Sequence, residues 1–104
     1  MKITKVQGKK FDKSTSNVKG IVEVTLDNCF VVKDIRIIEK PEKMIVAMPS
    51  KTVSGRNEDG TINEELRVRK DQAHPINKET REMFNSVILG AYERATTDEF
   101  VEEY

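Results

Sequence analysis

The residues best suited to chemistry are four cations on either side of a polar stretch. Three of these positive charges fall within five positions, and the fourth directly follows a Pro-Ser pair. Pro49 cannot donate a hydrogen bond to a sheet, so we expect it to end a strand that begins at Met44. If the ends of the stretch lie close together, the cations converge on a phosphate-binding patch. They are Lys51, Arg67, Arg69 and Lys70.

The alternative for the same residues is a salt-bridged loop without a ligand. Four carboxylates lie between the cations in the sequence and could neutralise them on the surface. The residues themselves leave both interpretations open. The carboxylates are Glu58, Asp59, Glu64 and Glu65.

The groups available for catalysis are sparse, and we predict no enzyme. Cys29 and His74 are the single cysteine and the single histidine, so a zinc site of the usual four-ligand kind is not expected. Cys29 falls at a predicted hairpin, and nothing in the sequence indicates a lowered thiol pKa there. Gly55 and Gly60 are too far apart for a phosphate-binding glycine loop, and no Gly-Lys-Ser/Thr follows. No cofactor is predicted.

The composition is that of one small domain. The chain has 104 residues, of which 37% are hydrophobic and 35% charged, and its formal net charge is zero. No apolar run reaches transmembrane length and no signal peptide is evident, so we predict no membrane insertion. One cysteine allows no intramolecular disulfide, which favours a reducing cytoplasm.

Alternating apolar residues predict strands in the first half of the chain. Residues 18–26 alternate with period two, and residues 29–38 are rich in β-branched types. Asp27-Asn28 between them predicts a two-residue turn. That register pairs Leu26 with Cys29, Val24 with Val31, and Gly20 with Ile35.

The remaining segments complete an antiparallel meander of about four strands. Residues 1–7 and 44–48 each predict a strand, whereas residues 51–65 show no sustained period and predict a loop. Residues 66–69 alternate again and predict a further strand with an arginine face.

One helix is clear near the C-terminal end of the sequence. Asn77 is a good N-cap, and apolar residues recur at helical spacing over 83–95. Strands followed by a helix predict an α+β fold, with an antiparallel sheet and the helix packed on one face. We assign residues 1–95 to this single domain. Residues 96–104 form either an acidic tail or an extra helical turn.

Apolar residues on both predicted sheet faces indicate self-association. In the predicted register, Phe30 and Val32 lie on the face opposite Val24. One helix cannot cover both faces, and exposed apolar surface or a free strand edge is typical of a dimer interface. We therefore expect a sheet-mediated homodimer.

Three stretches, in their order and spacing, resemble the stage V sporulation protein G family of septation regulators. They are TLDNCFVVKDIRII (25–38), VAMPSK (46–51) and DQAHPIN (71–77), the last followed by a helix, and the resemblance spans about residues 1–94. It implies a cytoplasmic bacterial protein that influences septum formation, sporulation and gene expression. It also implies a non-enzymatic homodimer that binds DNA and, in some members, RNA. Lys51 matches the family lysine, and Lys70 stands where the family has arginine.

The resemblance and the cations together give one function hypothesis and one main rival, and a second rival is an enzyme in which Cys29 and His74 form a nucleophile–base pair. The first is a homodimeric nucleic-acid-binding regulator of septation and sporulation genes, with no small-molecule substrate. Its predicted contacts are Lys51, Arg56, Arg67, Arg69 and Lys70. The main rival is a protein-interaction adaptor at the septum, for which nucleic-acid binding has no physiological role. Affinity that barely changes with salt would favour the main rival.

Overall fold

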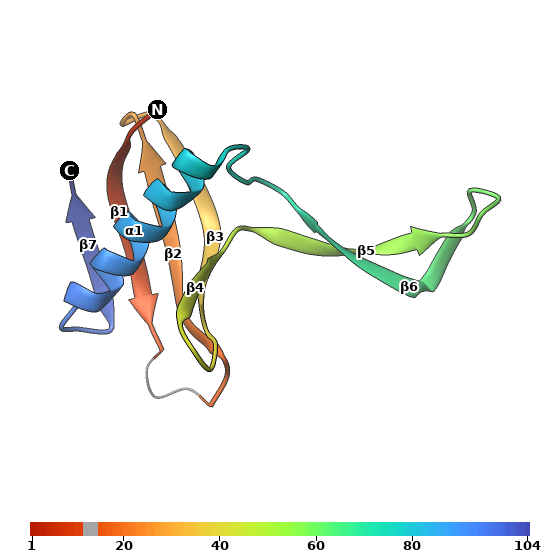
Figure 1. Cartoon of the computed structure of the whole chain (residues 1–104), viewed down its shortest axis with the longest axis horizontal. Helices are drawn as coiled ribbons and strands as arrows, with labels where there is room; N and C mark the ends of the chain where they lie inside the picture. The colour runs from red at the N-terminus through yellow and green to blue at the C-terminus, as the bar shows by residue number, and fades with distance from the viewer. Residues whose placement is uncertain (12–14) are drawn as a thin grey trace.

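The computed structural model describes residues 1–11 and 15–104, which form two antiparallel sheets and one helix (Figure 1). This arrangement confirms the predicted α+β class. The elements are β1 (Ile3–Lys10), β2 (Val18–Leu26), β3 (Phe30–Glu39), β4 (Met44–Ala47), β5 (Ser50–Arg56), β6 (Ile62–Asp71), α1 (Lys78–Arg94) and β7 (Glu99–Glu103).

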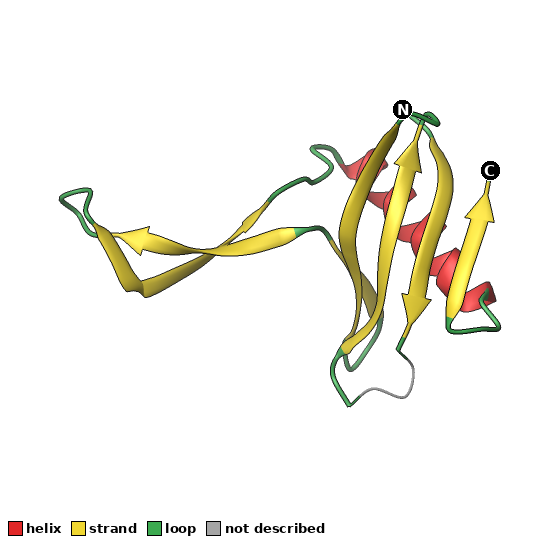
Figure 2. Cartoon of the chain, turned by 180° about the vertical axis from the view of Figure 1, so that it is seen from behind, coloured by secondary structure: helices red, strands yellow, loops and turns green. Residues whose placement is uncertain are grey.

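The body of the protein is a five-stranded sheet with the helix across one face. The strand order is β4-β3-β2-β1-β7, and every pair is antiparallel. Figure 2 shows α1 behind this sheet and the opposite face uncovered. Phe84, Ile88 and Ala91 of the helix are buried in one cluster with Ile35 and Ile37 of the sheet. The helix on one sheet face is therefore confirmed, and the dimer stays a prediction.

The helix begins at the predicted residue. The side chain of Asn77 accepts a hydrogen bond of 2.8 Å from the backbone N–H of Thr80, which satisfies one of the free donors of the first turn. At the other end, Lys10 Nζ donates to the backbone oxygen of Ala95 at 3.2 Å and lies 4.5 Å from the centre of the Tyr92 ring. A cation at the C-terminal end of a helix is favourable because the helix dipole is negative there.

The predicted register between β2 and β3 is wrong. Leu26 pairs with Phe30, Val24 with Val32, and Gly20 with Ile37, instead of Leu26 with Cys29, Val24 with Val31 and Gly20 with Ile35. The turn includes Cys29 as a third residue, which shifts the pairing by one position.

A second irregularity in β3 shifts the register further. Asp34 has a φ of 62°, and the pairing moves again between Val22 and Val24. An extra residue in one strand produces such a bulge. Because a one-residue shift exchanges the faces of a strand, Val32 lies buried in the core rather than on the opposite face.

Residues 99–103 form a strand, so the prediction of an acidic tail or helical turn for 96–104 is wrong. This strand, β7, pairs with β1, and Phe100 faces Gly8. Phe100 is 8% exposed and belongs to the core cluster, so burial of its ring fixes the segment on the sheet.

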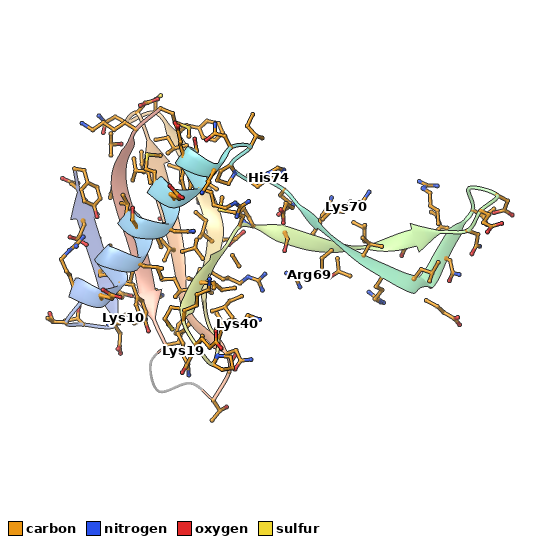
Figure 3. All side chains as sticks on the ribbon, viewed as in Figure 1. Lys10, Lys19, Lys40, Arg69, Lys70 and His74 are labelled. Carbon is orange, nitrogen blue, oxygen red and sulfur yellow. The ribbon has the colours of Figure 1, made fainter. Side chains whose placement is uncertain are left out.

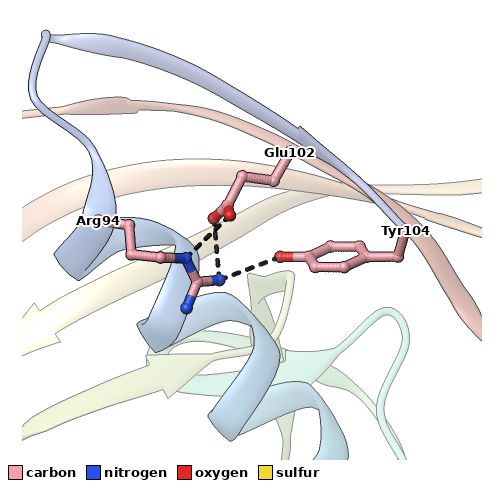
Figure 4. A network of polar contacts seen from close by, with 3 residues as sticks. All are labelled: Arg94, Glu102 and Tyr104. Carbon is pink, nitrogen blue, oxygen red and sulfur yellow. Dashed lines mark hydrogen bonds and ion pairs between the residues drawn. The ribbon is translucent and has the colours of Figure 1, made fainter.

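Polar contacts also join β7 to the helix. Arg94 Nε donates to Glu102 at 2.9 Å, and Arg94 lies 3.5 Å from the hydroxyl of Tyr104 (Figure 4). Partial desolvation of the Tyr104 phenol, together with the nearby Glu102 carboxylate, raises its pKa above the ordinary value.

The loop predicted for residues 51–65 is also wrong, because most of it is strand. β5 and β6 form a two-stranded ribbon, here called the arm (residues 50–71), that projects from the body (Figures 1 and 2). The molecule consequently measures 51 × 34 × 22 Å along its principal axes. The strand predicted for residues 66–69 is confirmed as part of β6. Within the described residues, α1 is too polar and too short to cross a membrane.

Candidate nucleic-acid interface

The arm leaves the body at Pro49, as the sequence indicates. β4 ends at Ala47, and Pro49 is buried between β4 and β5. The backbone oxygen of Pro49 accepts a hydrogen bond of 2.7 Å from the N–H of Gln72, which holds the two ends of the arm together. The convergence of the two arm ends is therefore real, and it places Ser50 beside Asp71.

The two faces of the arm differ in chemistry. Successive side chains of a strand point to opposite faces, so register partners share a face. One face, the arginine face, carries three hydroxyls, two guanidinium groups and, at its base, one carboxylate: Ser50, Thr52, Ser54, Arg67, Arg69 and Asp71. The other, the lysine–valine face, carries Lys51, Val53, Val68 and Lys70.

The structure therefore brings the predicted cations to one arm but not to one face. Figure 3 shows Arg69 and Lys70 on opposite sides of the ribbon. Arg67 and Arg69 lie two positions apart in β6 and share their face with the β5 hydroxyls. Lys51 and Lys70 face each other on the reverse side. A ligand on the arginine face would meet two of the four cations directly.

These cations form no direct ion pairs with carboxylates in the part of the chain that the structure describes. No ion pair joins Lys51, Arg67, Arg69 or Lys70 to an acidic residue there. Arg69 instead donates a hydrogen bond of 2.6 Å to the hydroxyl of Ser50. Asp59 accepts from the N–H and the hydroxyl of Thr61 at 3.0 and 2.6 Å. The alternative of a salt-bridged loop therefore has no support among these residues.

Arg56 lies apart from the other predicted contacts. It sits near the tip of the arm, beyond a register shift between Ser54 and Gly55, and donates to the backbone oxygen of Gly60 at 2.9 Å. This bond ties the guanidinium to the turn, where Gly60 adopts a φ of 87°. The geometry gives Arg56 a role in closing the arm.

The sequence reasoning missed Arg36. This residue of β3 is half-buried and lines a cavity of about 250 Å³ at the base of the arm, together with Ile21, Asp34, Ser50, Arg69 and Gln72. A larger hollow of about 630 Å³ on the uncovered sheet face shares Ile21 and Asp34 with it. The alternation of Arg36 with the buried Ile35 and Ile37 was a signal that Arg36 faces away from the core.

The residues considered for catalysis do not form a site. Cys29 is exposed in the turn between β2 and β3, whereas His74 Nδ1 lies 3.0 Å from the backbone oxygen of Pro75. In the described ranges no hydrogen bond joins the two side chains, and no group of three or more His, Cys, Asp or Glu residues is arranged to hold a metal ion.

The fold and the site define a class of small α+β proteins with a partly cationic β-ribbon outside the core. Similar proteins have been found in several bacteria. One from Clostridium beijerinckii is 45% identical over 102 residues, covering 98% of this chain and 99% of its own. One from Bdellovibrio bacteriovorus is 42% identical over 94 residues, covering 90% of this chain and 75% of its own. Both carry the name "Putative septation protein SpoVG".

The family to which this chain belongs can be stated from these matches and from a family model. The sequence model of the family named SpoVG matches residues 1–94, and this chain belongs to that family. The resemblance seen in the three motifs is thereby confirmed. The matched range includes the whole arm and α1, whereas β7 lies beyond it.

Proposed function

We propose that the protein is a nucleic-acid-binding regulator of septation and sporulation genes, and that it acts as a homodimer. The names of its relatives support a role connected with septation. The observation that carries the nucleic-acid part is the arginine face: Arg67 and Arg69 project from an exposed ribbon with hydroxyls beside them.

This ribbon has the shape and the chemistry for a polyanion. The major groove of duplex DNA admits a two-stranded β-ribbon. Arginine recognises phosphate and guanine through paired N–H donors, and serine and threonine hydroxyls donate to phosphate oxygens. In this proposal Arg67 and Arg69 contact the nucleic acid, while Lys51 and Lys70 add to the attraction from the reverse face.

The lysine–valine face supports the homodimer. Val68 is 46% exposed, and it lies beside Val53 on a ribbon that has no body packed against it. A two-stranded hairpin alone is at best marginally stable in water. A second copy that packs on the two valines would bury Val68 and stabilise the arm, while the long side chains of Lys51 and Lys70 extend past the contact into solvent. A two-fold arrangement would use the same patch on both copies.

A binding titration tests the nucleic-acid part of the proposal. Fluorescently labelled duplex DNA and single-stranded RNA would each be titrated with the full chain at several salt concentrations, and the anisotropy recorded. Displacement of counterions from phosphates predicts a linear fall of log affinity with log salt, with a slope of about −0.9 for each phosphate contacted on duplex DNA. No binding, or an affinity that barely changes with salt, would favour the protein-interaction adaptor instead.

A further inference from the structure

The cavity at the base of the arm brings together two arginines from different sheets. Arg36 belongs to β3 of the body and Arg69 to β6 of the arm, yet both line the same cavity of about 250 Å³. This volume is below the range usual for drug-sized ligands. It suits a small group such as a phosphate, and the cavity is here called the arm-base niche.

The other groups of the niche are suited to an anion. The hydroxyl of Ser50 already orients Arg69 through the 2.6 Å hydrogen bond, which leaves further guanidinium N–H groups of Arg69 for a ligand. Gln72 adds an amide that can donate, and Ile21 supplies an apolar wall. A guanidinium group can donate two parallel N–H hydrogen bonds to two phosphate oxygens, whereas an ammonium group has no such planar pair of donors.

Asp34 is the one carboxylate of the niche, and it opposes an anion. Its φ of 62° lies in the left-handed region, which asparagine and aspartate adopt more readily than most residues. No ion pair joins Asp34 to Arg36 or Arg69 within the described residues. The niche thus holds two fixed positive charges and one negative charge.

We propose that the arm-base niche binds one phosphate group between Arg36 and Arg69, with Asp34 as a built-in opponent that limits the affinity. The proposal deepens the proposed function and rests on it for the identity of the ligand: a phosphodiester group of nucleic acid that runs from the arginine face onto the body. The chemistry of the niche itself is that of any phosphate.

Two variants with opposite expected effects test the proposal. Arg36→Gln removes one guanidinium, and we expect it to weaken phosphate binding about tenfold or more, because a hydrogen bond between charged groups is lost. Asp34→Asn removes the opposing charge, and we expect it to tighten binding roughly threefold. Asparagine tolerates the same backbone conformation, and tighter binding cannot result from unfolding. Arg81→Gln on the exposed surface of α1 is the matched control.

Each variant would be measured with two probes. The first is inorganic phosphate, followed by NMR shifts of the arginine Nε–H signals. The second is labelled duplex DNA, titrated at several salt concentrations. For Arg36→Gln, the slope of log affinity against log salt concentration should become smaller in magnitude by about one, as expected for the loss of a single phosphate contact. Thermal unfolding followed by circular dichroism verifies that every variant is folded.

The outcomes separate the niche from the wider function. If wild type binds DNA and neither Arg36→Gln nor Asp34→Asn differs from Arg81→Gln with either probe, the niche is overturned and the proposed function survives. If wild type binds no nucleic acid but phosphate shifts the Arg36 and Arg69 signals, the niche survives and the nucleic-acid function is overturned. Loss in Arg36→Gln together with gain in Asp34→Asn supports the niche.

Discussion

Lys51 and Lys70 face each other directly across the register of β5 and β6. Like charges at opposed positions destabilise a strand pair. Among the described residues no carboxylate forms an ion pair with either lysine. The arm therefore carries a repulsion that its own fold does not relieve, and a polyanion close to the ribbon would relieve it.

The two faces of the arm should differ in their effect on nucleic-acid binding. We expect the double variant Arg67→Gln/Arg69→Gln to lower the salt slope on duplex DNA by about two, since it removes two phosphate contacts. The double variant Lys51→Gln/Lys70→Gln removes the same charge from the reverse face and should lower the slope less. Anisotropy titrations at matched salt measure both. An equal or larger effect of the lysine pair would contradict the assignment of the arginine face.

A charge on the lysine–valine face should disrupt the dimer. Val68→Asp replaces an apolar side chain that is present twice in a two-fold interface. Burying a valine contributes at least about 1.5 kcal/mol, so we expect the dimer to weaken more than about 100-fold. Sedimentation equilibrium measures the change. Thr52→Glu adds the same charge on the opposite face and should leave the dimer intact; a chain that is monomeric as wild type would refute the interface.

Phe100 should contribute far more to stability than the polar contacts of β7. We expect Phe100→Ala to lower the free energy of unfolding by about 3 kcal/mol, because it leaves a cavity in the core. Arg94→Ala should have a much smaller effect, since its ion pair with Glu102 is 58% and 29% exposed. Urea unfolding followed by circular dichroism compares the two. A larger loss for Arg94→Ala would mean that the polar contacts hold the strand.

An acid titration of Asp59 should reveal whether the turn at the tip of the arm is formed in solution. Hydrogen bonds from the hydroxyl and the N–H of Thr61 stabilise the charged form of Asp59 and hold the pKa of its carboxyl below the ordinary value. Because the folded pKa is lowered, the contribution to turn stability is complete above the unfolded pKa of about 3.9 and is lost as the pH falls through the lowered folded value.

The midpoint of the Asp59 titration can be measured directly from the NMR shift of its side-chain carboxyl carbon as the pH is changed. Thr61→Val should return it toward the ordinary value, because the hydroxyl donor is gone. A midpoint at the ordinary value in wild type would mean that the turn is not formed in solution.

Most of the fold that was predictable packs on the core, although β7 with its buried Phe100 was not predicted. The helix start follows from Asn77 and from the apolar spacing behind it, and β2 and β4 follow from buried residues at strand spacing. Within the arm, only the segment 66–69 was predicted as strand, and β5 was not. Strand β5 does not pack against the five-stranded sheet or the helix. Neither of its faces has to be apolar, so Ser50–Arg56 shows no alternating hydrophobic pattern.

The register of β2 and β3 depends on two local backbone conformations. The residue types at these positions allow the conformations but do not require them. Asp27 and Asn28 adopt positive φ as expected, but the inclusion of Cys29 in the turn and the bulge at Asp34 are choices among similar energies. The candidate site was only partly predictable for a similar reason. The sequence pattern places Arg36 on the side of β3 away from the core. That Arg36 lies near Arg69 depends on the direction in which the arm leaves Pro49, which the sequence does not reveal.

The short strand β7 has a consequence for solubility. Without it, the long strand β1 would form the margin of the sheet and expose a row of unpaired backbone groups, which is a template for aggregation. β7 occupies that margin and presents Glu103, whose charge disfavours a further acidic strand, while Glu99 forms an ion pair of 3.6 Å with Lys9 of β1. We therefore expect these five residues, which lie beyond the matched range 1–94, to limit edge-to-edge association of the sheet.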